Sequence, residues 1–286
     1  FGLIPRLNAA GRLGHAGNSL DLLTSTDINR ATAIASELEM QNRRRQTFTE
    51  SGVAQADAQI RRQHPTDSPS LIVVGHASWE PGILGLIAGR INDSYYRPAI
   101  AVQIGTKVSR ASARSIPEFD IISAMETCAP LFTKYGGHAR AAGFTIATEH
   151  MRELVARLRE IADIDMKGTQ LQPELAIDCD ALPSEVEGSN FDFVQGLSPF
   201  GESNPTPVFA ARGIRVLEAR GVGGGKHLKM RLADAEKSWD AIAFRQGYQT
   251  RIAGTYIDVA YSLEWNTWQG RKTLQMIVSD IKPAGS

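Results

Sequence analysis

A long stretch of helical periodicity follows a short segment rich in small residues at the start of the chain. From Ile28 to Arg62, apolar residues recur at a spacing of three and four without proline, which predicts one helix on the order of 50 Å long. Ser25 or Thr26 is placed to cap its first turn. The stretch 42–46 is polar on nearly every side, which is typical of a helix that bridges two domains through solvent.

The pattern after this helix predicts a small α/β domain over residues 68–165. Leu71–Gly75 is a continuous apolar run of the kind found in buried parallel strands. With a helix at 83–93 and a strand at 99–104, it forms a βαβ pattern. The other elements predicted in this domain are a strand near 108–114 and helices near 120–133 and 149–163.

The C-terminal part of the chain has the pattern of an all-β domain. Beyond a short helix near 191–197, glycine-bearing turns separate five runs of apolar and β-branched residues. Five short strands at this spacing predict a small barrel of the oligonucleotide-binding type. The strands are predicted at 208–220, 228–232, 239–244, 257–265 and 273–281.

These elements divide the 286 residues into four parts. The chain opens on the apolar run Phe1–Pro5 with no initiator methionine, so we expect a fragment whose N-terminal part is missing. The four parts are the tail of an upstream domain at 1–24, a connecting helix at 25–64, the α/β domain at 68–165, and an acidic connector with the barrel at 173–286.

Composition is that of a soluble globular protein, with 42% apolar and 22% charged residues. No apolar run approaches the ~20 residues of a membrane span, and no signal peptide opens the chain. Cys128 and Cys179 cannot form a disulfide framework, and neither they nor the histidines show metal-ligand spacing. A membrane protein, a secreted disulfide-rich fold and a zinc ribbon are therefore excluded. We expect a cytoplasmic monomer that holds no metal of its own.

The net charge is zero, but the charges are segregated along the chain. Residues 173–206 hold seven acidic residues and no basic one, whereas residues 207–286 carry a net charge of +5. Residues 1–172 carry +2. A basic barrel behind an acidic connector permits binding to a phosphate backbone.

A segment rich in glycine and alanine, Gly136–Phe144, is the first candidate for chemistry. The paired glycines Gly136 and Gly137 let the backbone approach a ligand closely, and His138 can donate a hydrogen bond to a phosphate or a base. Arg140 adds a positive charge two residues on. The alternative is a glycine-rich turn with a structural histidine, and the residues alone leave both open.

A second candidate lies on the strand predicted at 108–114. The period of two places Arg110, Ser112 and Arg114 on one face, where guanidiniums and a hydroxyl can hold a phosphate. A solvated edge strand would show the same pattern. The helix N-terminus after Trp79 also offers N–H groups to an anion, unless Trp79 is only a packing lid. No nucleophile elbow, P-loop or Rossmann fingerprint occurs, so we expect no self-contained catalytic centre.

Taken in order, these segments resemble the RecJ family of single-strand-specific exonucleases, within the DHH phosphoesterase superfamily. Ile4–Arg12 resembles the end of that family's catalytic DHH domain. The resemblance runs nearly end to end, although the Asp-His-His motif is absent and Glu80 stands where relatives place a histidine. The segments similar to the DHHA1 domain are Trp79–Arg90, Tyr96–Ala99, Ser112–Ser115 and Gly136–Gly143, and those similar to the oligonucleotide-binding (OB) domain are Leu197–Gly201, His227–Lys229, Asn266–Trp268 and Leu274–Pro283.

The resemblance implies the substrate-binding part of a 5′-to-3′ exonuclease that releases 5′-mononucleotides from single-stranded DNA in repair and recombination. Two Mn²⁺ or Mg²⁺ ions in the missing DHH domain would activate water, so this chain alone would be inactive. Single-stranded DNA is the implied ligand, with a single-stranded-DNA-binding protein and a helicase as further partners. The implied fold is an α/β DHHA1 domain preceded by a long interdomain helix and followed by a small antiparallel β-barrel (OB-fold).

The resemblance also implies roles for individual residues. Ser112 and Arg114, with Arg12 opposite them, would hold the 5′ phosphate. Gly137 and His138 would contact the scissile nucleotide. The barrel would hold the strand, with aromatic rings stacked on bases unless they belong to its core. The other substrate-binding candidates are Arg110, Gly136, Arg140, Lys229 and Trp268, and the other candidate rings are Trp239, Phe244 and Trp265.

Two other functions stay open. The chain can be a pure single-stranded nucleic-acid-binding module that hydrolyses nothing. It can also be a relative that degrades short oligoribonucleotides or cyclic dinucleotides, which shares the Gly-Gly-His element. That last class lacks a long interdomain helix followed by a barrel, and so accounts for less of the chain.

Overall fold

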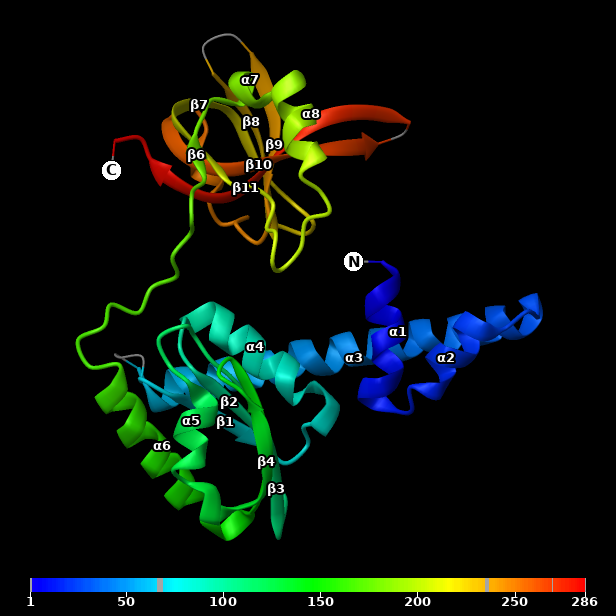
Figure 1. Cartoon of the computed structure of the whole chain (residues 1–286), viewed down its shortest axis with the longest axis vertical. Helices are drawn as coiled ribbons and strands as arrows, with labels where there is room; N and C mark the ends of the chain where they lie inside the picture. The colour runs from blue at the N-terminus through cyan, green and yellow to red at the C-terminus, as the bar shows by residue number, and fades with distance from the viewer. Residues whose placement is uncertain (1, 66–68, 235–236, 269, 286) are drawn as a thin grey trace. The chain divides into compact units, whose positions relative to one another are not determined.

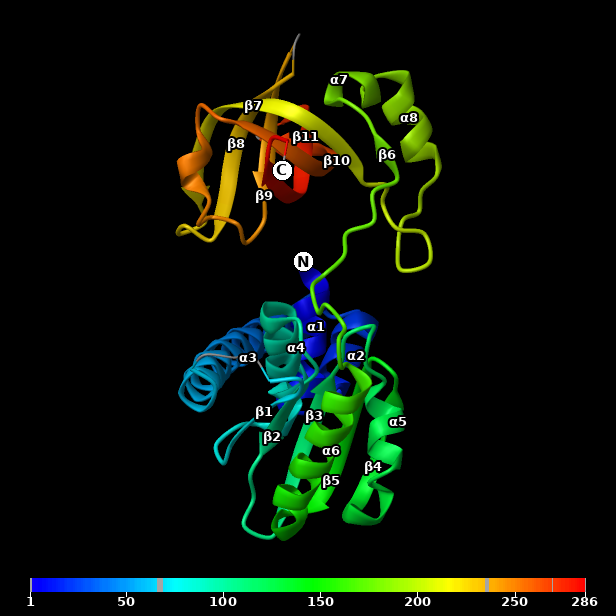
Figure 2. The same ribbon diagram turned by 90° about the vertical axis from the view of Figure 1, so that its left-hand side faces the viewer.

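The computed structural model of the chain describes residues 2–65, 69–234, 237–268 and 270–285, with only the backbone described for Trp268. The chain folds into two compact units, which we call unit 1 (Phe1–Pro173) and unit 2 (Glu174–Ser286). Figures 1 and 2 show that each unit has a sheet of its own. Each unit is described below by itself.

Three helices open unit 1, namely α1 (Leu3–Leu13), α2 (Gly17–Thr24) and α3 (Ile28–Gln63). The predicted long helix is confirmed, and α1 and α2 both pack on it. Its N-cap is Asp27 rather than Ser25 or Thr26. The Asp27 carboxylate accepts hydrogen bonds from the backbone N–H groups two and three residues further on, at 2.8 and 3.4 Å, which satisfies donors that a helix start leaves unpaired.

The polar part of α3 is less solvated than its sequence predicts. Leu38 and Asn42 are buried, on the side of α3 where α1 packs through its own buried Ala9 and Ala10. The Arg6 guanidinium of α1 also donates to the carboxylate beside Leu38, that of Glu39, at 2.5 Å. The small alanine side chains let the two helix backbones approach closely. Asn42 is therefore covered by protein rather than by solvent on this side of α3.

A mixed five-stranded sheet forms the centre of unit 1, in the order β1-β2-β3-β5-β4. Strands β1 and β2 are parallel and joined by α4, which confirms the predicted βαβ unit, and the other pairs are antiparallel. Helix α4 lies on one face of the sheet, and α5 and α6 cover the other (Figure 2). The elements are β1 (Ile72–His76), α4 (Leu84–Tyr95), β2 (Ala99–Gln103), β3 (Val108–Arg114), α5 (Ile121–Glu126), β4 (Phe132–His138), β5 (Ala141–Ala147) and α6 (Met151–Asp165).

The helix predicted at 120–133 is wrong in its second half. Helix α5 ends at Glu126, and a 3-10 turn with Pro130 leads into β4, which begins at Phe132. Proline cannot donate to a continuing helix, and the paired glycines after it disfavour one. The Gly-Gly-His segment is therefore a strand and forms a hairpin with β5. Short 3-10 turns span Pro81–Ile83 (η1), Ala129–Leu131 (η2), Thr148–His150 (η3) and, in unit 2, Thr250–Ile252 (η4).

Unit 2 is a closed five-stranded barrel, as predicted. Its sheet runs β10-β11-β9-β8-β7, and a further pairing of β10 with β7 closes it. One pair, β9 with β11, is parallel, so the barrel is not antiparallel throughout. The strands are β7 (Phe209–Val222), β8 (His227–Ala233), β9 (Ser238–Ala243), β10 (Tyr256–Trp268) and β11 (Arg271–Pro283).

The acidic connector lies against the barrel within unit 2. Its short strand β6 (Cys179–Asp180) pairs with the start of β7, and helices α7 (Pro183–Val186) and α8 (Ser189–Gly196) follow. Phe191 of α8 is buried in the barrel core with Val216 and Tyr261. Burial of this aromatic ring anchors the connector, whose acidic side chains stay mostly at the surface.

Candidate nucleic-acid site

One face of the sheet in unit 1 carries the polar residues that the sequence singles out. Every second residue of β3 is buried, and two of these, Ala111 and Ala113, belong to the core under α5 and α6. Arg110, Ser112 and Arg114 therefore project to the opposite face, the one on which α4 lies, as the period of two predicts.

The strand register extends this face across β5 to β4. Ser112 pairs with Gly143, and Gly143 pairs with Gly136, so two glycines continue the row that Ser112 begins. Helix α4 contacts β2 and β3, whereas residues 133–138 of β4 are exposed, so the glycine end of this row is open. The flanking rows are Arg114–Ala141–His138 on one side and Arg110–Thr145–Lys134 on the other.

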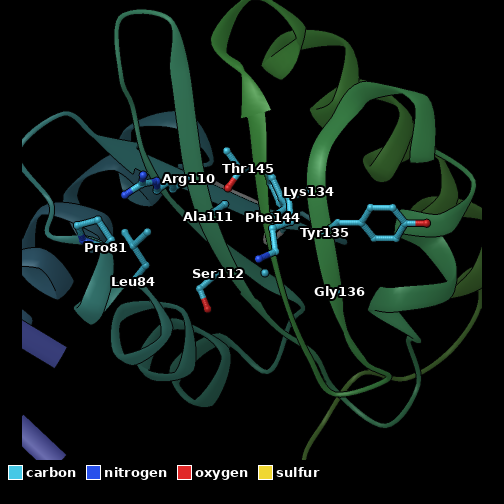
Figure 3. Close-up of a pocket in the computed structure, with 11 residues that line it drawn as sticks. Pro81, Leu84, Arg110, Ala111, Ser112, Lys134, Tyr135, Gly136, Phe144 and Thr145 are labelled. Atoms are coloured by element: carbon cyan, nitrogen blue, oxygen red, sulfur yellow. The ribbon is translucent and has the colours of Figure 1, made fainter. Parts of the chain in front are cut away.

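A hollow of about 500 Å³ lies over this row. Pro81 and Leu84, at the start of α4, form one side of it, and Tyr135 directs its ring away from it (Figure 3). Lys134 and Thr145 also line the hollow, and neither was singled out in the sequence. The signal for Lys134 is its position two residues before Gly136, which places both on one face once the segment is known to be a strand.

Arg114 is held at the start of α4 by its own neighbours. Its Nη1 donates to the Ala113 carbonyl at 2.7 Å and to the Ser112 hydroxyl at 3.4 Å. A Cβ atom at Gly85 of α4 would lie 2.9 Å from the Arg114 Nη2 and 3.1 Å from the Ser112 Oγ. A glycine there gives the guanidinium and the hydroxyl room beside the helix.

Arg12, from the end of α1, reaches the same helix start. Its Nη1 donates to the Gly82 carbonyl at 3.4 Å. Its backbone is closer still, because a Cβ atom at Gly82 would lie 1.8 Å from the Arg12 carbonyl oxygen. Two segments about 70 residues apart in sequence therefore lie in close contact, which the missing side chain of Gly82 permits. This contact directs the side chain of Arg12 to the N-terminal side of α4.

The electrostatics of this face favour an anion. Burial, and then the charge of Arg12, lower the pKa of Arg114, so the charged form of this guanidinium is less stable here than in water. No ion pair among the described residues includes Arg12, Arg110 or Arg114. Positive charges that are partly buried and lack a carboxylate gain most from an external anion.

The Gly-Gly-His segment combines a structural glycine with an open one. Gly137 has φ +154°, and a Cβ atom there would lie 2.3 Å from the Ala141 carbonyl oxygen. At Gly136 a Cβ atom would meet nothing within 4 Å. The hairpin itself requires glycine at 137, whereas the space above Gly136 is available to a ligand.

His138 and Arg140 stand exposed at the turn of this hairpin. The backbone N–H of Arg140 donates to Nδ1 of His138 at 3.4 Å. In the neutral ring the proton is then on Nε2, which makes that nitrogen the donor. His138 shares its row with Arg114, two strands away, at roughly 10 Å by the spacing of neighbouring strands.

Trp79 has the packing role that its sequence left open. It is 3% exposed, and its Nε1–H donates to the Gln55 side chain of α3 at 2.7 Å. This indole therefore ties α3 to the loop before α4.

In unit 2 the candidate rings divide into core and surface. Trp239 is buried, and its Nε1–H donates to Asp234, so it belongs to the core. Phe244 is 52% exposed with the His227 ring edge-on at 5.3 Å, and Tyr248, which the sequence analysis did not single out, is 79% exposed. Trp265 is 46% exposed and carries the Lys272 ammonium 4.3 Å over its ring. The side chain of Trp268 lies outside the described residues.

Lys229 lies on β8 in a row with Arg220 of β7. It is partly buried, and a lysine in such a position ordinarily buries its methylene stem and keeps its ammonium in water. Lys226 is exposed in the turn before β8. The basic residues of the barrel are thus spread over several strands rather than gathered at one point.

Among the described residues, no group of three or more His, Cys, Asp and Glu could hold a metal ion. The groups described here are guanidiniums and backbone N–H groups, which bind anions, and hydroxyls without the carboxylates that a divalent-cation site needs. These residues therefore do not fit a Mn²⁺ or Mg²⁺ site. No helix in the described part of the chain is long and apolar enough to cross a membrane.

Comparison with known proteins matches both units. Residues 68–163 match the DHHA1 domain family, and residues 177–280 match the RecJ OB domain family. The chain is 30% identical over 285 residues to the single-stranded-DNA-specific exonuclease RecJ of Bacillus subtilis, covering 98% of this chain and 36% of that protein. It is 32% identical over 295 residues to that of Thermus thermophilus, covering 99% and 40%.

Solved structures agree with this comparison. The crystal structure of RecJ from Thermus thermophilus in complex with Mn²⁺ is 29% identical, with a TM-score of 0.79, and the match covers 100% of this chain and 41% of that one. A DHHA1 domain preceded by a long helix and followed by a closed OB barrel defines the class of this protein. The chain contains a DHHA1 domain and a RecJ OB domain, and over nearly its whole length it is similar to RecJ exonucleases. It spans 36% to 51% of the length of the curated relatives that it matches.

Proposed function

We propose that this chain is the substrate-binding part of a 5′-to-3′ exonuclease acting on single-stranded DNA. The observation that supports this function is the arrangement of Arg12, Ser112 and Arg114. Among the described residues the two guanidiniums have no carboxylate partner, and the Ser112 hydroxyl lies beside the Arg114 guanidinium. Next to them is the hollow that Gly136 and Gly143 line. Such a face suits a terminal phosphate, which carries more negative charge than an internal diester.

In this proposal, Ser112, Arg114 and Arg12 bind the 5′ phosphate. The open backbone at Gly136 and the Nε2–H of His138 then contact the nucleotide that follows, with Arg140 at the turn beside it. Gly137 acts through the shape of the hairpin rather than by contact. Arg110 lines the hollow and adds a further contact to the strand.

Hydrolysis is assigned to groups outside the residues described here. The related crystal structures hold Mn²⁺ or Mg²⁺, and such an ion supplies a Lewis acid and an activated water when bound. The residues of this chain bind and orient the strand. The chain by itself is therefore expected to release no nucleotide with either metal.

In this proposal the barrel of unit 2 binds the single-stranded DNA beyond its 5′ end. Its net charge of +5 over residues 207–286 implies a few phosphate contacts, Lys229 among them, and Phe244 and Tyr248 offer faces for stacking. Affinity should fall severalfold or more between 50 and 200 mM salt, at about 0.7 log units per contact per log of salt. An affinity that does not depend on salt would contradict this assignment.

The proposal is tested with the 286-residue chain and short oligothymidylates that differ only at the 5′ end. We expect the 5′-phosphorylated oligonucleotide to bind at least tenfold tighter than the 5′-hydroxyl one, because charge-assisted hydrogen bonds contribute about 1.5–3 kcal/mol. Arg114→Ala should remove most of that preference. The matched control is Arg152→Ala, an exposed arginine of α6 on the opposite face of the sheet, which should leave it unchanged. Equal affinity of the wild-type chain for the two ends would overturn the proposal.

A non-catalytic binding module is the second candidate function. It is favoured by the lack of any metal-holding cluster among the described residues. The end preference separates the two candidates, because a module that only holds single strands has no need to distinguish a 5′-phosphorylated from a 5′-hydroxyl oligonucleotide. A 5′-labelled oligonucleotide incubated with the purified chain and Mn²⁺ tests the expectation that both candidates share. Label released as mononucleotide would exclude a pure binding module and would also contradict the expectation that hydrolysis needs groups outside these residues.

A further inference from the structure

Arg45 lies where α3 passes from α1 to α4. Asn42, three residues earlier and on the same face, is buried on the side where α1 packs. Gly52, seven residues later and again on that face, meets α4, because a Cβ atom there would lie 2.5 Å from the Ile87 side chain. Arg45 therefore faces the junction at which Arg12, at the end of α1, meets Gly82, at the start of α4.

The bonding of Arg45 is incomplete. Its Nη2 donates to the Asn42 side chain at 3.0 Å. Its Nε is buried and has no hydrogen-bond partner, and no ion pair among the described residues includes this guanidinium. The rest of the side chain is only partly buried. An unpaired buried donor on a partly buried charge costs free energy, so such a guanidinium is ordinarily paired with an acid.

The charges around Arg45 have the same sign as its own. Burial, and then the charges of Arg12 and Arg90, lower the pKa of this guanidinium. Arg12 also lowers the pKa of Arg114, so the charge of Arg12 acts on both Arg45 and Arg114. Arginine stays protonated under all ordinary conditions, and the result is a cluster of like charges that repel one another in the absence of a ligand.

We propose that Arg45 belongs to the anion site of unit 1, and that its charge and unpartnered Nε–H, with Arg12, complete the cradle for a phosphate dianion. This proposal rests on the proposed function, which places the 5′ phosphate at Arg12, Ser112 and Arg114. It adds a binding residue that comes from the long helix rather than from the sheet. It also explains why a helix that packs two other helices keeps an arginine on its buried side.

The proposal has an unusual consequence for stability. If Arg45 only packed against its neighbours, removing it would lower the stability of the fold. If its charge is repelled by neighbouring charges, removing that charge raises the stability of the ligand-free fold. Arg45→Met keeps the length and apolar stem of the side chain and removes the charge. Hydrogen exchange of peptides from α1 and α3, measured in the full chain, reports the local stability, and peptides from unit 2 serve as an internal reference.

Without phosphate, Arg45→Met should slow exchange in α1 and α3, or leave it unchanged. Inorganic phosphate should protect these helices in the wild-type chain and protect them severalfold less in the variant. Affinity for a 5′-phosphorylated thymidylate should fall about tenfold, with no change for the 5′-hydroxyl form. Arg45→Lys, which keeps the charge, should recover part of the affinity.

The matched control is Arg43→Met, in the same helix. Arg43 is exposed and pairs with Glu39 at 3.0 Å, so its removal should change neither the phosphate effect nor the affinity. Faster exchange in Arg45→Met together with unchanged phosphate protection would overturn the inference, because Arg45 would then serve packing, or await a carboxylate from another protein segment. If Arg114→Ala abolishes the end preference and Arg45→Met does not, the inference fails alone. If only Arg45→Met abolishes it, the roles proposed for Ser112 and Arg114 fail.

Discussion

The two units carry their positive charge in different ways. Unit 1 has a small net charge, yet it brings Arg12, Arg45 and Arg114 together, partly buried and without acidic partners in the described residues. Unit 2 has the larger charge over its barrel, but its basic side chains are spread over strands and turns beside exposed rings. Local geometry, rather than net charge, therefore decides what each surface can recognise.

A fixed cluster and a dispersed surface differ in what they discriminate. Partly buried guanidiniums are held by packing before a ligand arrives, so they can distinguish one phosphate from another by charge and position. Exposed rings and flexible ammonium groups accept any base and any backbone phosphate. In the proposed function, unit 1 recognises the 5′ end of a single-stranded DNA, and unit 2 recognises its bases and phosphate backbone.

The largest expected effect tests whether unit 1 depends on a rigid hairpin. Gly137→Ala places a Cβ atom 2.3 Å from the Ala141 carbonyl oxygen and forces a strained φ. We expect it to destabilise unit 1 by about 1–3 kcal/mol or more and to reduce the end preference with it. Chemical denaturation and oligonucleotide binding measure the two effects.

Gly136→Ala is the control for that substitution, one residue away on the same strand. A Cβ atom at 136 meets nothing within 4 Å, so stability should change by less than about 1 kcal/mol. Any loss of binding in this variant then comes from ligand space rather than from folding. If Gly136→Ala and Gly137→Ala lose equal stability, the hairpin does not require glycine at 137.

The next effect tests whether unit 2 binds by stacking. Phe244→Ala should weaken binding of a long single strand by about 1–3 kcal/mol, the usual contribution of one stacked base, and should leave the preference for a 5′ phosphate unchanged. Phe193→Ala is the matched control. Phe193 is also exposed, at 73%, but lies on α8 within the acidic connector, which repels a phosphate backbone. Equal losses of affinity in both variants would show that the exposed rings affect binding through the stability of unit 2 or through unspecific contact, and not through stacking on a base.

Much of this arrangement follows from local pattern. The period of two in β3 places Arg110, Ser112 and Arg114 on one face, and the structure agrees because each side chain between them is buried. The barrel follows from five short strands with glycine-bearing turns, and its closure is confirmed. Where one element decides its own burial, the sequence is enough to predict it.

The remainder depends on contacts between distant segments. Strand β4 is exposed along residues 133–138 and contains two glycines, so it lacks the apolar alternation that marks a strand, and only its pairing with β5 makes it one. Arg45 looks like a solvated helix residue until α1 is packed on α3. Arg12 reaches the site only because Gly82 admits its backbone. No single stretch of sequence contains these facts.

The smallest expected effect concerns Lys134, which lines the hollow of unit 1 from the edge strand β4. It is exposed, and its long side chain is flexible, unlike the arginines around Arg12, so it should act as a simple phosphate contact. Lys134→Ala should weaken binding of a 5′-phosphorylated oligonucleotide only severalfold and lower the slope of log affinity against log salt by about 0.7. Lys107→Ala removes the same charge from the turn before β3 and is the control, with no change in affinity expected. A loss for Lys134→Ala as large as that for Arg114→Ala would mean that unit 1 also binds through dispersed charge, and the contrast between the two units would fail.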